Sequence, residues 1–278
     1  MKLFRFGPMG EEKPGVVDAS GKHRDLSDVI ADINPATIAG DLVKTVSHLD
    51  PSTLPEVPAA SRFGPCIAAP GNFIAIGLNY IEHARETNSP LPSEPILFNK
   101  AASCIVGPND DVMLPRGSQK SDWEVELAFV IGKQAHYVTE DEALSYVAGY
   151  CICNDVSERA YQLERGGQWM KGKCAPTFGP IGPYLVTPDE IPDPQQLSLW
   201  LDLNGERVQS SHTSDMIFPI RKIISYLSEF MVLMPGDLVT TGTPPGVGLG
   251  MKPERFLKRG DTMRLSVEGL GTQTQAVV

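Results

Sequence analysis

The segment from Ser121 to Gly132, SDWEVELAFVIG, constrains the fold more than any other part of the chain. Side chains two positions apart on a β-strand point to the same face. Glu124 and Glu126 would therefore share one face, and the opposite face would carry only apolar side chains, namely Val125, Leu127, Phe129 and Ile131. The pattern predicts a strand over Trp123–Ile131 that is packed against a core and carries two neighbouring carboxylates.

Two carboxylates about 7 Å apart on one strand face repel each other unless positive charge lies between them. A hard divalent cation such as Mg²⁺ supplies that charge and prefers oxygen ligands. Asp155 would add a third carboxylate, because it follows an apolar strand and precedes a helix. Two alternatives stay open at this point, since the glutamates can form a solvated outer face and Asp155 can cap the helix that follows it.

Polar residues at helical spacing form a second group of candidates. His83 and Glu86 are three positions apart, so they share a helix face, and a histidine oriented by a carboxylate can act as a general base. Arg159 and Gln162 have the same spacing, and arginine can hold a substrate carboxylate through two parallel hydrogen bonds. On spacing alone, an ordinary surface pair is the favoured interpretation of His83 and Glu86.

Two glycine-rich and proline-rich loops carry the remaining candidates. Lys173 lies in KGKCAPTFGPIGP, where an exposed lysine that only maintains solubility is the default interpretation. Thr243 lies in TTGTPPGVGLG, whose backbone amides and hydroxyl could bind a carboxylate, or which could be a tight structural turn. This second loop does not predict dinucleotide binding, because the G-x-G-x-x-G spacing is missing and Pro253 disfavours a following helix.

Composition favours a large globular protein. The 278 residues suit one large domain, or one with a small companion. We expect a small N-terminal α/β domain over residues 1–62 and a catalytic domain over residues 63–278. In the N-terminal part, strands are expected around residues 2–7 and 14–20, helices over 26–33 and 38–46, and a linker over 50–58.

The second part has mainly strand and turn signals, which predicts an α+β, mostly β architecture. Strands are expected at 73–77 and 123–131, and hairpins at 198–210, with Asn204-Gly205 in the turn, and at 261–278. Short helices should follow Asn79 and Ser157 as caps, the second ending at Gly166-Gly167. Further helices are expected near residues 140–146 and 217–231.

Charge and cysteine content indicate where the protein works. The net charge of −10 argues against nucleic acid or an anionic membrane as a partner. The sequence contains neither an apolar run long enough for a membrane span nor a signal peptide, so we expect a cytoplasmic protein. Five cysteines without a disulfide-like pattern suit a reducing compartment. Cys151 and Cys153 could bind a metal, although small buried apolar roles are commoner.

Five segments together resemble the fumarylacetoacetate hydrolase family. They occur in the family's order over roughly residues 70 to 270, and they read GLNYIEHARE, SDWEVELAFVIG, GYCICNDVSERAYQ, KGK followed by TFGPIGP, and MPGDLVTTGTPPGVG. The resemblance implies a mixed β-sandwich roll, often preceded by a small N-terminal domain, and a homodimer or higher homo-oligomer.

The resemblance also implies roles for individual residues. The metal ligands would be Glu124, Glu126 and Asp155, holding Mg²⁺, with Mn²⁺ or Ca²⁺ as alternatives. The catalytic residues would be His83, Glu86, Lys173 and Gln162. The substrate-binding residues would be Arg159, Thr243 and Lys100.

Within the family, SERAYQLERGGQW and LVTTGTPPGVGLGMKP are most similar to hydrolases of 2,4-diketo-3-deoxy sugar acids. This implies a metal-dependent hydrolase that cleaves a C–C bond of a 2,4-dioxo acid into pyruvate and a hydroxy acid. Oxaloacetate decarboxylation and isomerisation of a 2-hydroxy-diene-dioate are alternatives on the same scaffold. The sequence departs from the family pattern at Cys174-Ala175-Pro176 and at Ala101. The first departure could reshape the pocket near Lys173 and so bears on substrate identity.

Overall fold

A computed structural model describes residues 1–278, and its centre is a large mixed sheet. The strand order is β3-β2-β1-β11-β9-β8-β14-β4-β5, with β6 added beside β11. The strands are β1 (Lys2–Phe6), β2 (Lys13–Val17), β3 (His23–Asp25), β4 (Phe73–Gly77), β5 (Ile96–Lys100), β6 (Ile105–Val106), β8 (Val125–Ile131), β9 (Val147–Asn154), β11 (Gly179–Val186) and β14 (Leu238–Thr240). Strands β8 and β9 are buried along their whole length, as the apolar sequence of both predicts.

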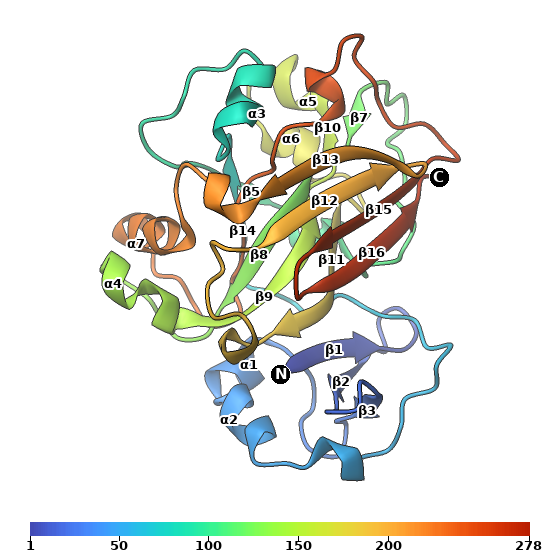
Figure 1. The fold of residues 1–278 in the computed structure, drawn as a ribbon, viewed down its shortest axis with the longest axis vertical. Helices are drawn as coiled ribbons and strands as arrows, with labels where there is room; N and C mark the ends of the chain where they lie inside the picture. Colours follow the sequence, from blue (N-terminus) through green and yellow to red (C-terminus); the bar gives the residue numbers. More distant parts are fainter.

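A second sheet of four strands lies over the central strands of the first (Figure 1). Its order is β13-β12-β15-β16, with β12 (Ser198–Leu203), β13 (Glu206–His212), β15 (Thr262–Val267) and β16 (Gly271–Ala276). Strands β12 and β15 contact β8, and β16 contacts β9 and β11. The predicted mostly β sandwich roll is confirmed, and both predicted hairpins are present, with Asn204-Gly205 between β12 and β13.

Short helices and a two-stranded ribbon surround one end of this sandwich (Figure 1). They are α3 (Ile81–Glu86), α5 (Arg159–Leu163) and α6 (Met170–Lys173), with the ribbon of β7 (Ser121–Asp122) and β10 (Ser157–Glu158). The other helices are α1 (Pro35–Ala39), α2 (Leu42–Ser47), α4 (Glu140–Ala143) and α7 (Ile220–Phe230), and 3₁₀ turns lie at 51–53, 102–104, 144–146, 188–190, 213–215 and 248–250. None of the helices has the length and apolar character that a bilayer crossing requires.

The N-terminal segment continues the central sheet, because β1 pairs with β11. Its apolar residues, including Leu3, Val16 and Leu42, belong to the same large core cluster as the residues of β8 and β9. The boundary near residue 62 stays a prediction.

Several predicted element boundaries were wrong. Residues 26–33 form turns rather than a helix, and Asp25 holds this turn by accepting a hydrogen bond from the amide of Ser27. The helix predicted over 38–46 is two helices, separated at Gly40 and at Asp41, which has a left-handed φ of 64°. The helix predicted near 140–146 is the short α4 followed by a 3₁₀ turn.

The caps and the central strand also differ from prediction. Tyr80 rather than Asn79 precedes α3, because the Asn79 amide instead binds the carbonyls of Phe218 and Thr241. Glu158 rather than Ser157 caps α5. The strand predicted over Trp123–Ile131 is interrupted, so that Glu124 lies in the gap between β7 and β8.

Candidate active site

Three buried carboxylates meet where β8 begins and β9 ends. Glu124 precedes β8, Glu126 is its second residue, and Asp155 follows β9. The two strands are antiparallel, with Val125 opposite Asn154 and Glu126 opposite Cys153, so the three acids come to the same place. One carboxylate oxygen from each residue lies within 4.8 Å of the others. The structure therefore brings together the three acidic residues that the sequence proposed as metal ligands.

Lys173 and Arg159 lie beside Glu124 and lower its pKa. Burial alone would raise the pKa of Glu124, but the Lys173 ammonium and the Arg159 guanidinium hold it well below the usual range. The Lys173 Nζ donates to Glu124 Oε2 at 2.6 Å and to Asp155 Oδ2 at 2.7 Å. The pKa of Glu126 is raised well above the usual range by burial and by the negative charges of Asp155 and Glu124.

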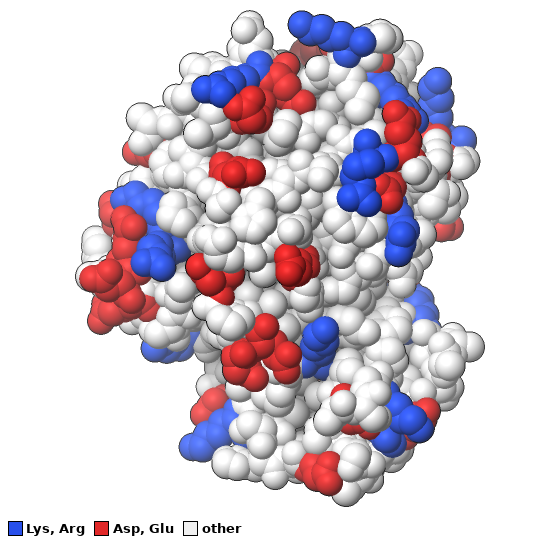
Figure 2. Space-filling model, in the orientation of Figure 1, with Lys and Arg blue, Asp and Glu red and all other residues white.

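The carboxylate set suits a divalent cation. Charged side chains of both signs are interspersed over the face shown in Figure 2, whereas the three acids are at most 4% exposed. All three offer oxygen atoms, which Mg²⁺, Mn²⁺ and Ca²⁺ prefer as ligands. A dication would also relieve the repulsion that raises the pKa of Glu126. The residues present therefore fit such an ion.

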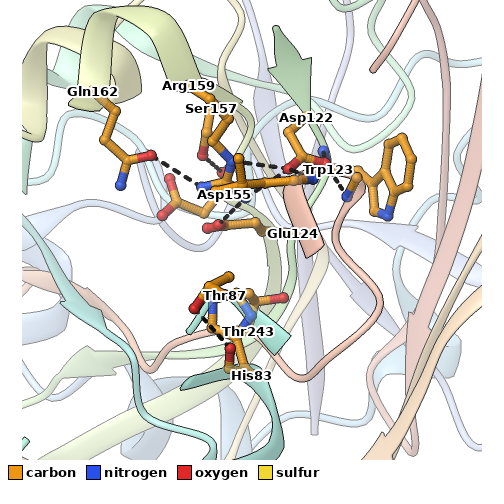
Figure 3. Close-up of polar contacts among 12 residues, drawn as sticks. His83, Thr87, Asp122, Trp123, Glu124, Asp155, Ser157, Arg159, Gln162 and Thr243 are labelled. Atoms are coloured by element: carbon orange, nitrogen blue, oxygen red, sulfur yellow. Dashed lines mark hydrogen bonds and ion pairs between the residues drawn. The ribbon is translucent and has the colours of Figure 1, made fainter. Parts of the chain in front are cut away.

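A histidine faces the acids across a small cavity. In Figure 3, His83 lies on the opposite side of the opening from Glu124 and Asp155, and it lines the cavity. Its Nδ1 lies 2.8 Å from Glu86 Oε1, which leaves Nε2 as the ring nitrogen available to a ligand. The other Glu86 oxygen accepts a hydrogen bond of 2.8 Å from the amide of Gly246. The pair predicted from the spacing on α3 is therefore formed and anchored.

Arg159 and Gln162 project from α5 into the same cavity. Arg159 Nε donates to Asp122 Oδ2 at 2.9 Å, and its Nη1 donates to Gln162 Oε1 at 3.0 Å. Its Nη2 is 2.7 Å from Glu124 Oε1, yet this buried nitrogen makes no well-directed hydrogen bond. The same nitrogen lies 2.9 Å from Asp122 Oδ2, so the Arg159 guanidinium bridges the carboxylates of Asp122 and Glu124.

Two of the predicted substrate-binding residues are already engaged within the protein. The Lys100 side chain is 0% exposed, and its Nζ donates to Asp155 Oδ1 at 2.6 Å and to the carbonyls of Lys173 and Phe178. Lys100 is not among the residues that line the cavity, so the structure does not bring it to a substrate. Thr243 lines the cavity, but its hydroxyl donates to the carbonyl of Val125 at 3.0 Å.

Six apolar side chains also line the cavity, which has a volume of about 110 Å³, and Thr87 and Ser89 add two hydroxyl groups. The apolar side chains are Ile76, Leu78, Phe98, Leu163, Trp169 and Leu249. Trp169 packs on the backbone of Gly77, where an added Cβ atom would lie 2.2 Å from the indole ring. Glycine at position 77 therefore leaves the room that the Trp169 ring needs to line the cavity.

Asp122 is a site residue that the sequence analysis did not identify. Its fully buried carboxylate accepts hydrogen bonds from the amides of Gly248 at 2.7 Å and Leu249 at 3.0 Å, besides the bond from Arg159. It thus connects the loop after β14 to the arginine of α5. Its place two residues before Glu124, on the same predicted strand face, is a signal that could have identified it.

The cysteines do not contribute to this site as metal ligands. The group of residues that could hold a metal contains carboxylates only, and Cys151 and Cys153 are buried within β9. All five cysteines are free thiols. At the departure from the family pattern, the amide of Ala101 donates to the Cys174 sulfur at 3.0 Å, so this thiol connects the end of β5 to the end of α6.

Comparisons with known proteins agree with this arrangement. Residues 72–278 match the model described as fumarylacetoacetate (FAA) hydrolase C-terminal. A Burkholderia orbicola protein (strain AU 1054) named "Putative hydrolase" is 54% identical over 276 residues, covering 99% of this chain and 98% of its own.

Two solved structures of different named activity are also similar. The maleylpyruvate hydrolase of Sphingobium sp. SYK-6, in complex with manganese(II) and pyruvate, is 29% identical with a TM-score of 0.82, over 100% of this chain and 99% of its own. The 2-hydroxyhepta-2,4-diene-1,7-dioate isomerase of Mycobacterium marinum is 32% identical with a TM-score of 0.78, and the match covers 100% of this chain and 98% of its own. With its family-model match, its mixed sandwich fold and its buried triad of carboxylates, this chain belongs to the fumarylacetoacetate hydrolase family.

Proposed function

We propose that the protein is a divalent-metal-dependent hydrolase that cleaves the C3–C4 bond of a 2,4-dioxo acid. The observation that carries this proposal is the placement of His83, anchored by Glu86, across the cavity from Glu124, Glu126 and Asp155. A hydrolase of this kind needs a base for water on one side of the substrate and a site for the pyruvoyl end on the other. Water and R–CO–CH₂–CO–COO⁻ give R–COO⁻, pyruvate and a proton.

The carboxylates would hold the ion, which is Mg²⁺ or Mn²⁺ in this proposal. The chemistry that such an ion supplies is Lewis-acid polarisation of the keto acid. Arg159, which lines the cavity, would bind an anionic or polar group of the substrate. Lys100 would orient the Asp155 carboxylate through its hydrogen bond to Oδ1 and would not contact the substrate.

His83 would supply the base. With Nδ1 held by Glu86, Nε2 takes a proton from water while the water oxygen bonds to C4. The C3–C4 bond then breaks, its electron pair passes to the pyruvate enolate, and C3 is protonated. Lys173 and Gln162 line the cavity and would stabilise the negative charge that develops.

The substrate class that we favour is a 2,4-diketo-3-deoxy sugar acid, on the basis of the sequence resemblance. An isomerase acting on an unsaturated 2-hydroxy dioate is the second candidate, because a similar structure carries that name. Isomerisation moves a proton within the substrate and needs no attacking water. The two candidates therefore differ in whether carbon–carbon cleavage occurs.

The test is a pyruvate assay on purified protein with 2,4-diketo-3-deoxy sugar acids and simple acylpyruvates, after chelation and after Mg²⁺ or Mn²⁺ is restored. We expect pyruvate and the matching acid in equal amounts, only with metal. Metal-loaded, folded protein that forms no pyruvate from any of them would refute the hydrolase. Conversion of a 2-hydroxy-diene-dioate without cleavage would then establish the isomerase.

A further inference from the structure

The edge of β8 changes its hydrogen-bonding partner at the residue between the two glutamates. Strand β14 pairs with β8 from Val130 to Ala128, and the amide of Thr241 then donates to the carbonyl of Leu127. The chain after Thr241 turns away into the glycine-rich loop. Val125 is beyond this point, so its backbone groups on that edge need other partners.

Gln209 supplies one of these partners from the other sheet. It lies in β13, is 1% exposed, and accepts a hydrogen bond of 3.0 Å from the amide of Val125 through Oε1. Its Nε2 donates to Thr243 Oγ1 and to the carbonyl of Pro244, both at 2.9 Å. The Thr243 hydroxyl in turn donates to the carbonyl of Val125. Gln209 and Thr243 thus satisfy both backbone groups of Val125, in the place of a neighbouring strand.

The direction of both glutamate side chains depends on this backbone. Glu126 is the second residue of β8 and Glu124 directly precedes this strand, so the backbone of Val125 between them sets the direction of both side chains. One carboxylate oxygen of Glu124 and one of Glu126 lie within 4.8 Å of each other. If the peptide at Val125 could rotate, the carboxylates would move apart. A rigid backbone here therefore keeps the ligand spacing that a small cation needs.

We propose that Gln209 is a positioning residue of the metal pocket, which sets the spacing of Glu124 and Glu126 by fixing Val125 between them. The glutamine amide suits this role because it combines one acceptor with two donors, and all three are used. Gln209 makes no contact with the carboxylates, and it does not line the cavity. It acts through the backbone of Val125 and the hydroxyl of Thr243.

Gln273 provides a matched control. This glutamine of β16 is 0% exposed and donates to the carbonyls of Ile152 and Gly182, each at 3.0 Å. It contacts neither Val125 nor Thr243, and it reaches the site only through Gln275 and Asn154. Gln209→Met and Gln273→Met therefore remove similar buried amides, of which only the first bonds to the backbone of Val125 between Glu124 and Glu126, whereas the second bonds to β9.

The test measures Mn²⁺ binding to each folded variant in the absence of substrate. Titration calorimetry gives the affinity, and the electron paramagnetic resonance signal of bound Mn²⁺ reports the geometry of the site. We expect Gln209→Met to weaken Mn²⁺ binding at least tenfold and to broaden the bound signal, and Gln273→Met to change affinity less than threefold. Circular dichroism establishes that both variants are folded. Wild-type affinity in Gln209→Met, or equal weakening in both variants, would overturn the proposal.

Thr243→Val provides a second variant if Gln209→Met does not fold. It removes the hydroxyl that bridges Gln209 and Val125 while keeping the side-chain shape. We expect a Mn²⁺ affinity at least threefold below the wild type, and an unchanged affinity would overturn the proposal. The inference assumes the metal site of the proposed function but not its reaction. A failed pyruvate assay with normal Mn²⁺ binding therefore refutes the hydrolase alone.

Discussion

His83 and Glu86 form a hydrogen bond of 2.8 Å across one turn of α3, and this bond determines which imidazole nitrogen is free. A carboxylate at Nδ1 favours the proton on that nitrogen, so Nε2 keeps its lone pair. His83 lines the cavity, and Figure 3 shows it on the opposite side of the opening from Glu124 and Asp155. The geometry suits removal of a proton from water rather than metal ligation.

Substitution of His83 tests that role. His83→Gln should lower kcat by about 10²–10⁴-fold, the usual contribution of a general base. Mn²⁺ affinity should stay within about threefold of the wild type, because His83 is not in the carboxylate cluster. Parallel turnover and Mn²⁺ titration measurements would check both expectations. A variant that turns over at the wild-type rate would remove His83 from the mechanism.

Glu126→Gln should separate metal binding from folding. The Glu126 carboxylate accepts hydrogen bonds from the Thr240 hydroxyl and the Gly242 amide, and a glutamine carbonyl can accept both. Because burial and two neighbouring acids disfavour its charge, the neutral amide should keep the metal-free protein within about 1 kcal/mol of wild-type stability. Thermal denaturation with and without Mn²⁺ should show that the ion no longer raises Tm. A full Mn²⁺-dependent rise in Tm would contradict the assignment of Glu126 as a ligand.

Lys100→Met should be strongly destabilising. Removal of the ammonium leaves the buried Asp155 carboxylate with one fewer cationic partner, and breaking a buried ion pair in this way typically costs about 3–5 kcal/mol. Lys22→Met is the control, since the Lys22–Glu56 pair is about half exposed and such pairs contribute about 0–1 kcal/mol. Urea unfolding of the metal-free variants measures both. Equal, small losses would show that Lys100 does not support Asp155.

His23 should make the stability depend on pH. Burial lowers its pKa, and it packs edge-on against Phe4 and Phe63 with Nε2 3.0 Å from the Tyr184 hydroxyl. As the pH falls below the ordinary histidine range, the unfolded chain binds this proton first, so the free energy of unfolding should decrease. Above that range the contribution is complete. Denaturant titrations between pH 7.5 and about pH 5 should show a shallower slope for His23→Gln; an unchanged slope would exclude His23 as the source.

Local patterns predicted some elements of the fold and missed others for physical reasons. Asn204-Gly205 specifies its hairpin, because these residues favour a tight two-residue turn. The strand β8 could be predicted because its apolar residues are visible in the sequence. The helix predicted over 26–33 is absent, because a segment of about two helical turns is too short to offset the cost of helix nucleation. Asp25 also offers the backbone a competing turn. The break between β7 and β8 at Glu124 could not be predicted, because the Glu124 amide bonds to the side chain of Asn154, 30 residues away in the sequence.

The site divides in the same way. The acids and the His83–Glu86 pair follow from strand and helix periods, whereas Gln209 is 84 residues from Val125 and lies in a strand with no polar signal that distinguishes it. The structure also places Lys100 in an ion pair with Asp155, which the spacing of the two residues in the sequence could not reveal. The homodimer, the cytoplasmic location and the identity of the sugar acid stay predictions.

The central claim is that water attacks the substrate and that a carbon–carbon bond is cleaved. The most direct measurement is turnover of an acylpyruvate in H₂¹⁸O with Mg²⁺, followed by mass spectrometry of both products. The account predicts equal amounts of pyruvate and of the acyl-derived acid, with one solvent ¹⁸O in the carboxylate of that acid. Substrate consumption without cleavage, or cleavage that leaves the acyl-derived acid unlabelled, would contradict it.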